Sequence, residues 1–161
     1  MEHLWTPWRM EYILSEKGKH CIFCEMIEAD DDRARHVLCR GKRAFIVLNR
    51  YPYNNGHLMV APYEHAASLE ELDAETLLEL MQLVNKALAA LRRAMNPHGF
   101  NIGVNLGKVA GAGVEDHVHI HVVPRWEGDT NYMPILAETR VIPEMLDQTY
   151  DRLCAALEGA K

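Results

Sequence analysis

Three histidines spaced two residues apart, His117, His119 and His121, form the segment with the most chemical potential in this sequence. Side chains on a β-strand alternate between its two faces, so a strand here would present all three imidazoles on one face. A neutral imidazole is a good nucleophile near pH 7, and a neighbouring imidazole can donate to a phosphate or leaving-group oxygen. The spacing predicts attack on phosphorus, while a metal site and a solvated histidine stripe are the alternatives.

A glycine-rich segment, Gly107–Asp116, leads directly into the histidines. Glycines let backbone amides approach an anion closely, and consecutive amides can cradle a phosphate. The segment matches neither the Walker A loop nor the dinucleotide-binding fingerprint. It gains significance only from its position before the histidines, with Lys108 and Arg125 as nearby cations.

A second motif is the C-x-x-C pair formed by Cys21 and Cys24. This spacing suits zinc, because one turn of chain brings both thiolates to a single ion. The spacing also occurs in redox proteins, but the βαβ pattern of a thioredoxin-like context is not visible around it. Cys39 and Cys154 have no visible partner, and we interpret them as buried apolar residues.

The elements that must position these motifs are short. Runs rich in β-branched residues, bounded by Gly, Pro and Asn, predict five strands. Ser68–Glu71 has the form of a capping box, and Asp73 is a second cap before apolar residues at helical spacing. Asn96-Pro97 ends this long helix, and a C-terminal helix is predicted from about Pro143. The order predicts an α+β fold with a mainly antiparallel sheet; the predicted strands are 36–40, 43–49, 57–62, 99–105 and 117–123.

The length and the net charge of the chain limit the functions that it can have. A chain of 161 residues predicts a single domain spanning residues 1–161. The net charge of −6 argues against broad binding to nucleic acid, which needs a basic face. No apolar run approaches the ~20 residues of a membrane helix, and the opening residues lack the order of a signal peptide. We therefore expect a cytoplasmic location without membrane attachment.

The chain resembles the histidine triad (HIT) superfamily, which is defined by His-x-His-x-His followed by two apolar residues. The segments 45–52 (FIVLNRYP) and 56–62 (GHLMVAP) also fit the family. The opening segment 4–9 (LWTPWR) and the Gly-Ala-Gly before the triad are most similar to bacterial diadenosine tetraphosphate (Ap4A) phosphorylases of this family. The resemblance implies a HIT-like fold with a core of about residues 21–126, an N-terminal arm, a C-terminal helix and a homodimer.

The resemblance also implies a mechanism. His119 would attack the α-phosphorus and form a nucleotidyl-histidine intermediate, which water or inorganic phosphate would release. His121 would bond the phosphate or the leaving oxygen, and a backbone carbonyl would orient His119. The nucleotide-binding positions implied by the family are Asn49 at the ribose, Asn105 near the leaving oxygen, His57 beside the triad, and the amides of Gly111, Ala112, Gly113 and Val114 at the α-phosphate.

Relatives that carry the cysteine pair complete a zinc site with two histidines, matched here by His65 and His117. The resemblance therefore implies a structural zinc ion bound by Cys21, Cys24, His65 and His117, bracing the strand that holds the nucleophile. Trp5, Trp8 and Trp126 offer flat faces for stacking on a base, or for packing.

The substrate class implied is a dinucleoside polyphosphate. Three alternatives stay open: a purine nucleoside phosphoramidate hydrolase, a nucleotide-binding zinc-braced protein with little turnover, and a metal-dependent hydrolase. The chain departs from the family pattern at Ala112-Gly113, where many relatives have Gln followed by Ser or Thr. Because those side chains help to hold the phosphate and the leaving group, the choice between water and phosphate as acceptor stays open.

Overall fold

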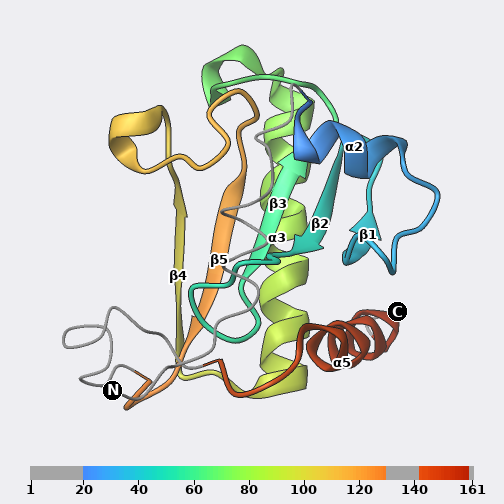
Figure 1. Cartoon of the computed structure of the whole chain (residues 1–161), viewed down its shortest axis with the longest axis vertical. Coiled ribbons are helices and arrows are strands. Elements are labelled where there is room, and N and C mark those ends of the chain that lie inside the picture. The colour runs from blue at the N-terminus through green and yellow to red at the C-terminus, as the bar shows by residue number, and fades with distance from the viewer. Residues whose placement is uncertain (1–19, 130–141, 160–161) are drawn as a thin grey trace, which may run out of the picture.

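The computed structural model describes residues 20–129 and 142–159, so the opening segment 4–9, with Trp5 and Trp8, lies outside the described residues. Five strands form one antiparallel sheet in the order β1-β2-β3-β5-β4 (Figure 1). The sequence predicted all five strands and the α+β class. The strands are β1 (Val37–Arg40), β2 (Ala44–Leu48), β3 (Leu58–Pro62), β4 (Gly99–Val104) and β5 (Ile120–Arg125).

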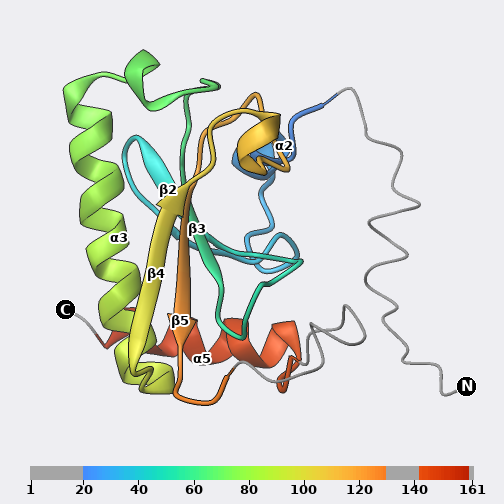
Figure 2. The same cartoon turned by 90° about the vertical axis from the view of Figure 1, so that its left-hand side faces the viewer.

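The helices divide between the two sides of the sheet. The long helix α3 (Ala74–Met95) covers one side, and the short helix α2 (Ile22–Glu28) lies on the other (Figure 2). The C-terminal helix α5 (Leu146–Glu158) packs against α3 and β1. Two short 3₁₀ helices, η1 (Leu69–Glu71) and η2 (Lys108–Ala110), interrupt the connections. No helix among residues 20–129 and 142–159 is long and apolar enough to cross a membrane.

Side chains along each strand alternate between the two sides of the sheet, and each side packs into a different apolar core. Val118, Ile120 and Val122 join the large apolar core beneath α3. The opposite side carries a smaller core, in which Phe23 of α2 packs on alternate residues of β2 and β3. We call this second side the histidine face, because the three histidines of the triad alternate with Val118, Ile120 and Val122 and therefore point away from the α3 core. Its apolar members are Phe23, Val37, Phe45, Val47, Met59 and Ala61.

The strand of the triad starts later than the sequence predicts. β5 begins at Ile120, not at residue 117, and its pairing with β3 extends only to Val60. The partner strand ends at Pro62, which has no N–H to donate to a ladder. The N–H of Val118 donates instead to the carbonyl of Ala66, at 2.7 Å. His117 and His119 therefore lie in the connection that leads into the strand.

Helix boundaries follow capping chemistry, with one wrong prediction. Ser68 precedes only the 3₁₀ turn η1, and its hydroxyl bonds Glu70 instead of capping the backbone. Asp73 caps α3, since its carboxylate accepts from the N–H of Thr76 at 2.7 Å. Asn96 ends α3 in the left-handed region. Helix α5 begins at Leu146, three residues after the predicted start.

Candidate functional site

The three histidines of the triad are all buried on the histidine face. Their exposed fractions are 0%, 6% and 9% for His117, His119 and His121. The ring of His119 lies between two neighbours, with centroid distances of 4.8 Å to Phe23 and 4.7 Å to His121. The spacing predicted a shared face, and the structure brings these imidazoles together on it.

Backbone carbonyls fix the tautomers of two of these rings. His119 Nδ1 lies 2.9 Å from the carbonyl oxygen of His117. A carbonyl can only accept, so Nδ1 of the neutral ring carries the proton and Nε2 keeps its lone pair. His117 Nε2 lies 2.8 Å from the carbonyl of Pro62, so its proton is on Nε2 and its lone pair is on Nδ1. The carbonyl that the family resemblance requires behind the nucleophile is that of His117.

His57 fixes the tautomer of the third ring. It is fully buried, and its Nδ1 accepts from the N–H of Tyr53 at 3.0 Å. The proton of neutral His57 is therefore on Nε2, which lies 2.9 Å from Nδ1 of His121 and donates to it. This leaves Nε2 of His121 as an N–H donor. The histidine face thus offers a nitrogen lone pair on His119 and an N–H on His121, on adjacent rings.

Burial keeps these rings neutral. It lowers the pKa of His117 and of His119 below the ordinary value of 6.5. Burial, with a smaller contribution from the neighbouring His119, lowers the pKa of His121 to about 4. Burial removes the hydration that would stabilise a protonated imidazole, and the apolar surroundings do not replace it. Both the nucleophilic and the donating tautomers are therefore the prevailing forms at neutral pH.

Asn49 lies behind His57. Its side chain is 9% exposed, and its Nδ2 lies 3.2 Å from His57 Nδ1. Its Oδ1 accepts from the N–H of Tyr51 at 2.9 Å. The structure therefore places both polar atoms of Asn49 in the network that holds His57, while its proposed contact with a ribose stays a prediction.

The glycine-rich segment folds into a tight turn over the start of the histidine strand. Gly107 and Gly111 adopt positive φ angles of 79° and 89°, which glycine tolerates without a Cβ clash. The amides of Gly111 and Ala112 close this turn on Lys108 and Gly107, and Asn105 Nδ2 reaches the Gly111 carbonyl at 3.4 Å.

The end of that turn reaches the histidine face. Val114 packs against its apolar cluster. Within the described residues, the amides of Gly113 and Val114 make no backbone hydrogen bond. The family resemblance implies that the amides of residues 111–114 bind a phosphate. The amides of Gly113 and Val114 are the two of these that make no hydrogen bond within the turn.

Two cysteines and two histidines converge at the first histidine of the triad, as the family resemblance implies. One ligand atom from each of Cys21, Cys24, His65 and His117 lies within 4.8 Å of all the others. Cys21 Sγ and Cys24 Sγ lie 3.3 Å and 3.7 Å from His117 Nδ1, and Cys24 Sγ lies 3.3 Å from His65 Nδ1. Ligand atoms around a tetrahedral zinc ion are separated by about 3.5 Å. The lone pair of His117 faces this cluster, so the donor set fits a zinc ion.

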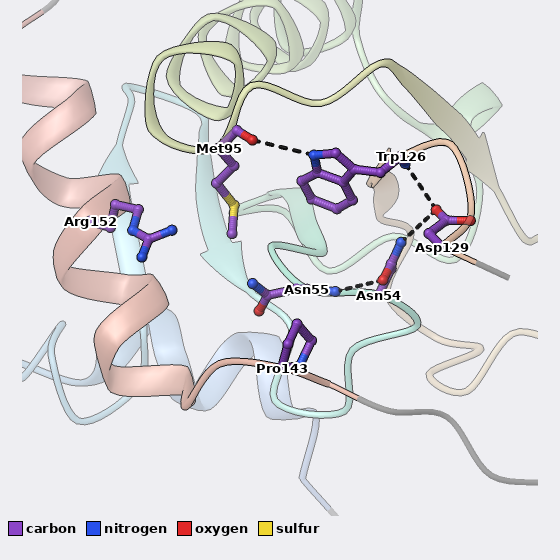
Figure 3. Close-up of a pocket in the computed structure, with 7 residues that line it drawn as sticks. All are labelled: Asn54, Asn55, Met95, Trp126, Asp129, Pro143 and Arg152. Atoms are coloured by element: carbon purple, nitrogen blue, oxygen red, sulfur yellow. Dashed lines mark hydrogen bonds between the residues drawn. The ribbon is translucent and has the colours of Figure 1, made fainter. Parts of the chain in front are cut away.

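A pocket of about 270 Å³ lies apart from the histidines, between α5, the end of α3 and the β2–β3 loop (Figure 3). Trp126 lines it, and its indole N–H donates to the carbonyl of Met95 at 3.3 Å. Asn54 bonds Asp129, and Arg152 pairs with Glu144. Trp126 therefore packs at this end of the sheet, not beside the triad.

Two aromatic residues of the site were missed at the sequence level. Tyr53 packs against His57 and His121, with ring centroids 4.4 Å and 5.5 Å away. Phe23 packs against His119 and lies between the two cysteines of the metal cluster. The position of Phe23 inside the C-x-x-C motif was the available signal, while nothing in the sequence marks Tyr53.

Comparison with known proteins gives a consistent result. Residues 31–128 match the family model described as "HIT domain". The chain is 41% identical to an AP-4-A phosphorylase of Mycobacterium tuberculosis over 170 residues, covering all of this chain and 86% of that protein. It is 33% identical to an adenosine 5′-monophosphoramidase of Schizosaccharomyces pombe, over 65% of this chain and 74% of that one. A crystal structure of a Zn-bound histidine triad family protein from Mycobacterium smegmatis superposes with a TM-score of 0.71 at 28% identity, covering 86% of this chain and 94% of that chain.

Proposed function

The chain belongs to the HIT domain family, and we propose on that premise that it transfers nucleotidyl groups from dinucleoside polyphosphates of the Ap4A type. The observation that carries the proposal is the fixed pair of tautomers on the histidine face. His119 presents a lone pair on Nε2, and the adjacent His121 presents an N–H. A nucleophile beside a hydrogen-bond donor is the arrangement that displacement at phosphorus requires.

In the first step, the lone pair of His119 Nε2 attacks the α-phosphorus. The new P–N bond forms as the bond from phosphorus to the leaving polyphosphate oxygen breaks, so Ap4A would release ATP. His121 Nε2–H donates to the oxygen on which negative charge develops. The positive charge that forms on the His119 ring is stabilised by its Nδ1–H bond to the carbonyl of His117.

In the second step, an acceptor attacks the phosphorus of the nucleotidyl-histidine and the P–N bond breaks. Inorganic phosphate as acceptor gives ADP, and water gives AMP. In both cases the electron pair of the P–N bond returns to His119 Nε2, which regenerates the neutral ring, and the proton that the acceptor loses passes to the solvent. The amides of Gly113 and Val114, which make no backbone hydrogen bond in the described part of the chain, are available to bind the phosphate oxygens.

The similarity to an adenosine 5′-monophosphoramidase supports a second candidate substrate class. A phosphoramidate has a P–N bond in place of the P–O bond that breaks, and the same attack by His119 would cleave it, with His121 Nε2–H supplying the proton with which the amine leaves. The two candidates share the nucleophile and differ in the leaving group.

We further propose that Cys21, Cys24, His65 and His117 hold a structural zinc ion. The convergence of four donor atoms supports this, as does the bound zinc of the M. smegmatis relative. Four protein ligands would fill a tetrahedral shell and leave no position for a reactive water. The ion would neutralise two thiolates and fix the ring of His117, whose carbonyl orients the nucleophile.

A homodimer is also proposed. β4 is the last strand of the sheet, and its outer edge pairs with no strand in the described part of the chain. Its residue Ile102 is 47% exposed, and α3 exposes Leu78 and Met81. An open strand edge is a surface on which a second copy can continue the sheet. Sedimentation analysis at micromolar concentration tests this, and a monomer there would contradict it.

The experiment that tests the reaction is chromatographic analysis of Ap4A turnover, with and without inorganic phosphate. ATP plus ADP, formed only with phosphate, identifies a phosphorylase, and ATP plus AMP without phosphate identifies a hydrolase. His119→Ala should abolish turnover, while His98→Ala, which removes an exposed imidazole, is the control. Near-normal turnover by His119→Ala would refute the covalent mechanism, and a wild type without products would favour phosphoramidates or a binding role.

A further inference from the structure

Phe23 occupies an unusual place between the metal cluster and the nucleophile. It stands within the C-x-x-C pair and is 0% exposed. Its ring centroid lies 4.8 Å from that of His119 and 5.1 Å from that of His117. No other residue of α2 is fully buried. The short helix therefore presents one apolar side chain to the sheet, and that side chain meets the reacting imidazole.

The nucleophile needs more than its hydrogen bond to be held in place. The bond from Nδ1 to the His117 carbonyl fixes one atom of the His119 ring, but it leaves the ring free to tilt about that atom. Tilting moves Nε2, the atom that must meet phosphorus in line. A flat side chain packed against the ring at 39° removes this freedom, because the core around it is close-packed.

We propose that Phe23 is a positioning residue, which sets the orientation of the His119 ring and so aims Nε2 at the α-phosphorus. The inference rests on the proposed function of His119 as nucleophile. Because it is completely buried, Phe23 acts through His119 and not by touching the substrate.

The metal cluster sits where it can stabilise this arrangement from both sides. Cys21 and Cys24 flank Phe23, so an ion bound to their thiolates would fix the turn that carries the phenyl ring. The same ion would hold His117, whose carbonyl bonds the other side of the nucleophile. The same four ligands would therefore stabilise both the packing of Phe23 on His119 and the hydrogen bond from His119 to the His117 carbonyl.

The test compares two leucine substitutions of matched size, Phe23→Leu and Phe45→Leu. Phe45 is also 0% exposed, and its ring packs on Phe23 and Tyr63 at 6.3 Å and 5.8 Å. Both variants should lose similar thermal stability. Because misplacement of a reacting group by about 1 Å costs about 100-fold in rate, Phe23→Leu should lower kcat by about 10- to 100-fold with KM nearly unchanged.

Phe45→Leu should keep kcat within about threefold of the wild-type value. Equal losses of kcat in the two variants, or an unchanged kcat in Phe23→Leu, would overturn the proposal. If Phe23→Leu does not fold, Phe23→Met takes its place, because methionine fills the volume without a flat ring. Full kcat in Phe23→Met would likewise overturn it.

A second readout does not depend on turnover. Nitrogen-15 NMR of the metal-loaded protein should show the Nδ1–H tautomer of His119 in both proteins, because the His117 carbonyl is kept, but the ring resonances should be shifted or broadened in Phe23→Leu. Unchanged ring shifts and line widths in Phe23→Leu would contradict the positioning role. A wild type that shows the single tautomer but forms no nucleotidyl-histidine would refute the proposed function and leave the packing of Phe23 intact.

Discussion

Acidification from pH 8 to pH 5 should destabilise the protein through His121, and the size of the effect follows from its surroundings. The imidazole is 9% exposed, and its pKa falls from 6.5 to about 4 on folding. The unfolded chain therefore binds a proton at pH 5 while the folded one does not. Stability from this group is fully present above pH 6.5 and is lost as the pH falls toward 4.

The magnitude follows from proton linkage. At pH 5 the unfolded-state imidazole, with a pKa of 6.5, is almost fully protonated, and the folded one, with a pKa of about 4, is mostly neutral. Preferential protonation of the unfolded chain then costs about 2 kcal/mol relative to pH 8. With a urea dependence of about 2 kcal/mol/M, the unfolding midpoint would move by about 1 M.

Urea unfolding at both pH values, followed by circular dichroism, measures this effect in the wild type and in His121→Asn. The amide oxygen of asparagine can still accept from His57 Nε2, so the variant removes the titration and keeps an acceptor. Other buried groups contribute to the loss in both proteins. The contribution of His121 is therefore the difference between the two losses, about 2 kcal/mol.

His98→Asn is the matched control. His98 is exposed, and its Nδ1 accepts from the N–H of Glu127 at 2.9 Å, so this substitution also replaces an imidazole acceptor by an amide. It should lose as much stability as the wild type. If His121→Asn also loses as much as the wild type between pH 8 and pH 5, the argument from burial is refuted.

Three further predictions concern separate parts of the molecule. His57→Ala should lower kcat by about 10- to 100-fold, because losing a buried hydrogen bond worth about 1–3 kcal/mol frees the tautomer of the donor histidine; steady-state kinetics measures this. Asp73→Ala should lower the unfolding free energy by about 1 kcal/mol, and Ser68→Ala by less than about 0.5 kcal/mol, in urea titrations. Elemental analysis should find about one zinc ion per chain, lost in the Cys21→Ser/Cys24→Ser double variant and on chelation, with a lower Tm in both cases.

The zinc prediction has a control within the same chain. Cys39→Ser changes a cysteine outside the metal cluster and should keep the zinc content of the wild type. A double variant that retains zinc would contradict the donor set. Normal kcat in His57→Ala would mean that the orientation of His121 does not depend on the buried pair.

The periodicity of the sequence was sufficient to predict the strands of the sheet and the side of the sheet on which the histidines lie. Alternation placed Val118 and Ile120 in the α3 core, which left the histidines on the other side. The ligand positions Cys21, Cys24, His65 and His117 came from the family resemblance, and the structure brings them together. The spacing of the two cysteines alone could not have supplied His65, which lies 41 residues from Cys24.

The missed features depend on contacts between distant segments. Helix α2 has seven residues and one buried side chain, so it is too short for a helical period to appear. The capping prediction at Ser68 was wrong because its hydroxyl has a nearer partner in Glu70. The late start of β5 follows from Pro62, which is remote in sequence and adjacent only in the folded sheet.

The two sides of the sheet are covered by layers of unequal thickness, so activity can be lost while most of the fold remains. The sheet and the 22-residue helix α3 share a broad core, whereas the histidine face is covered by a helix of seven residues. A helix that short is marginal by itself, so its stability depends on the packing of Phe23 and, with the proposed zinc ion bound, on the two thiolate ligands that flank Phe23. We therefore expect helix α2 to open at a lower free energy than the sheet and α3. Mild heat or chelation would open this layer first, and turnover would cease while the far-ultraviolet spectrum of α3 and α5 still reports a folded protein.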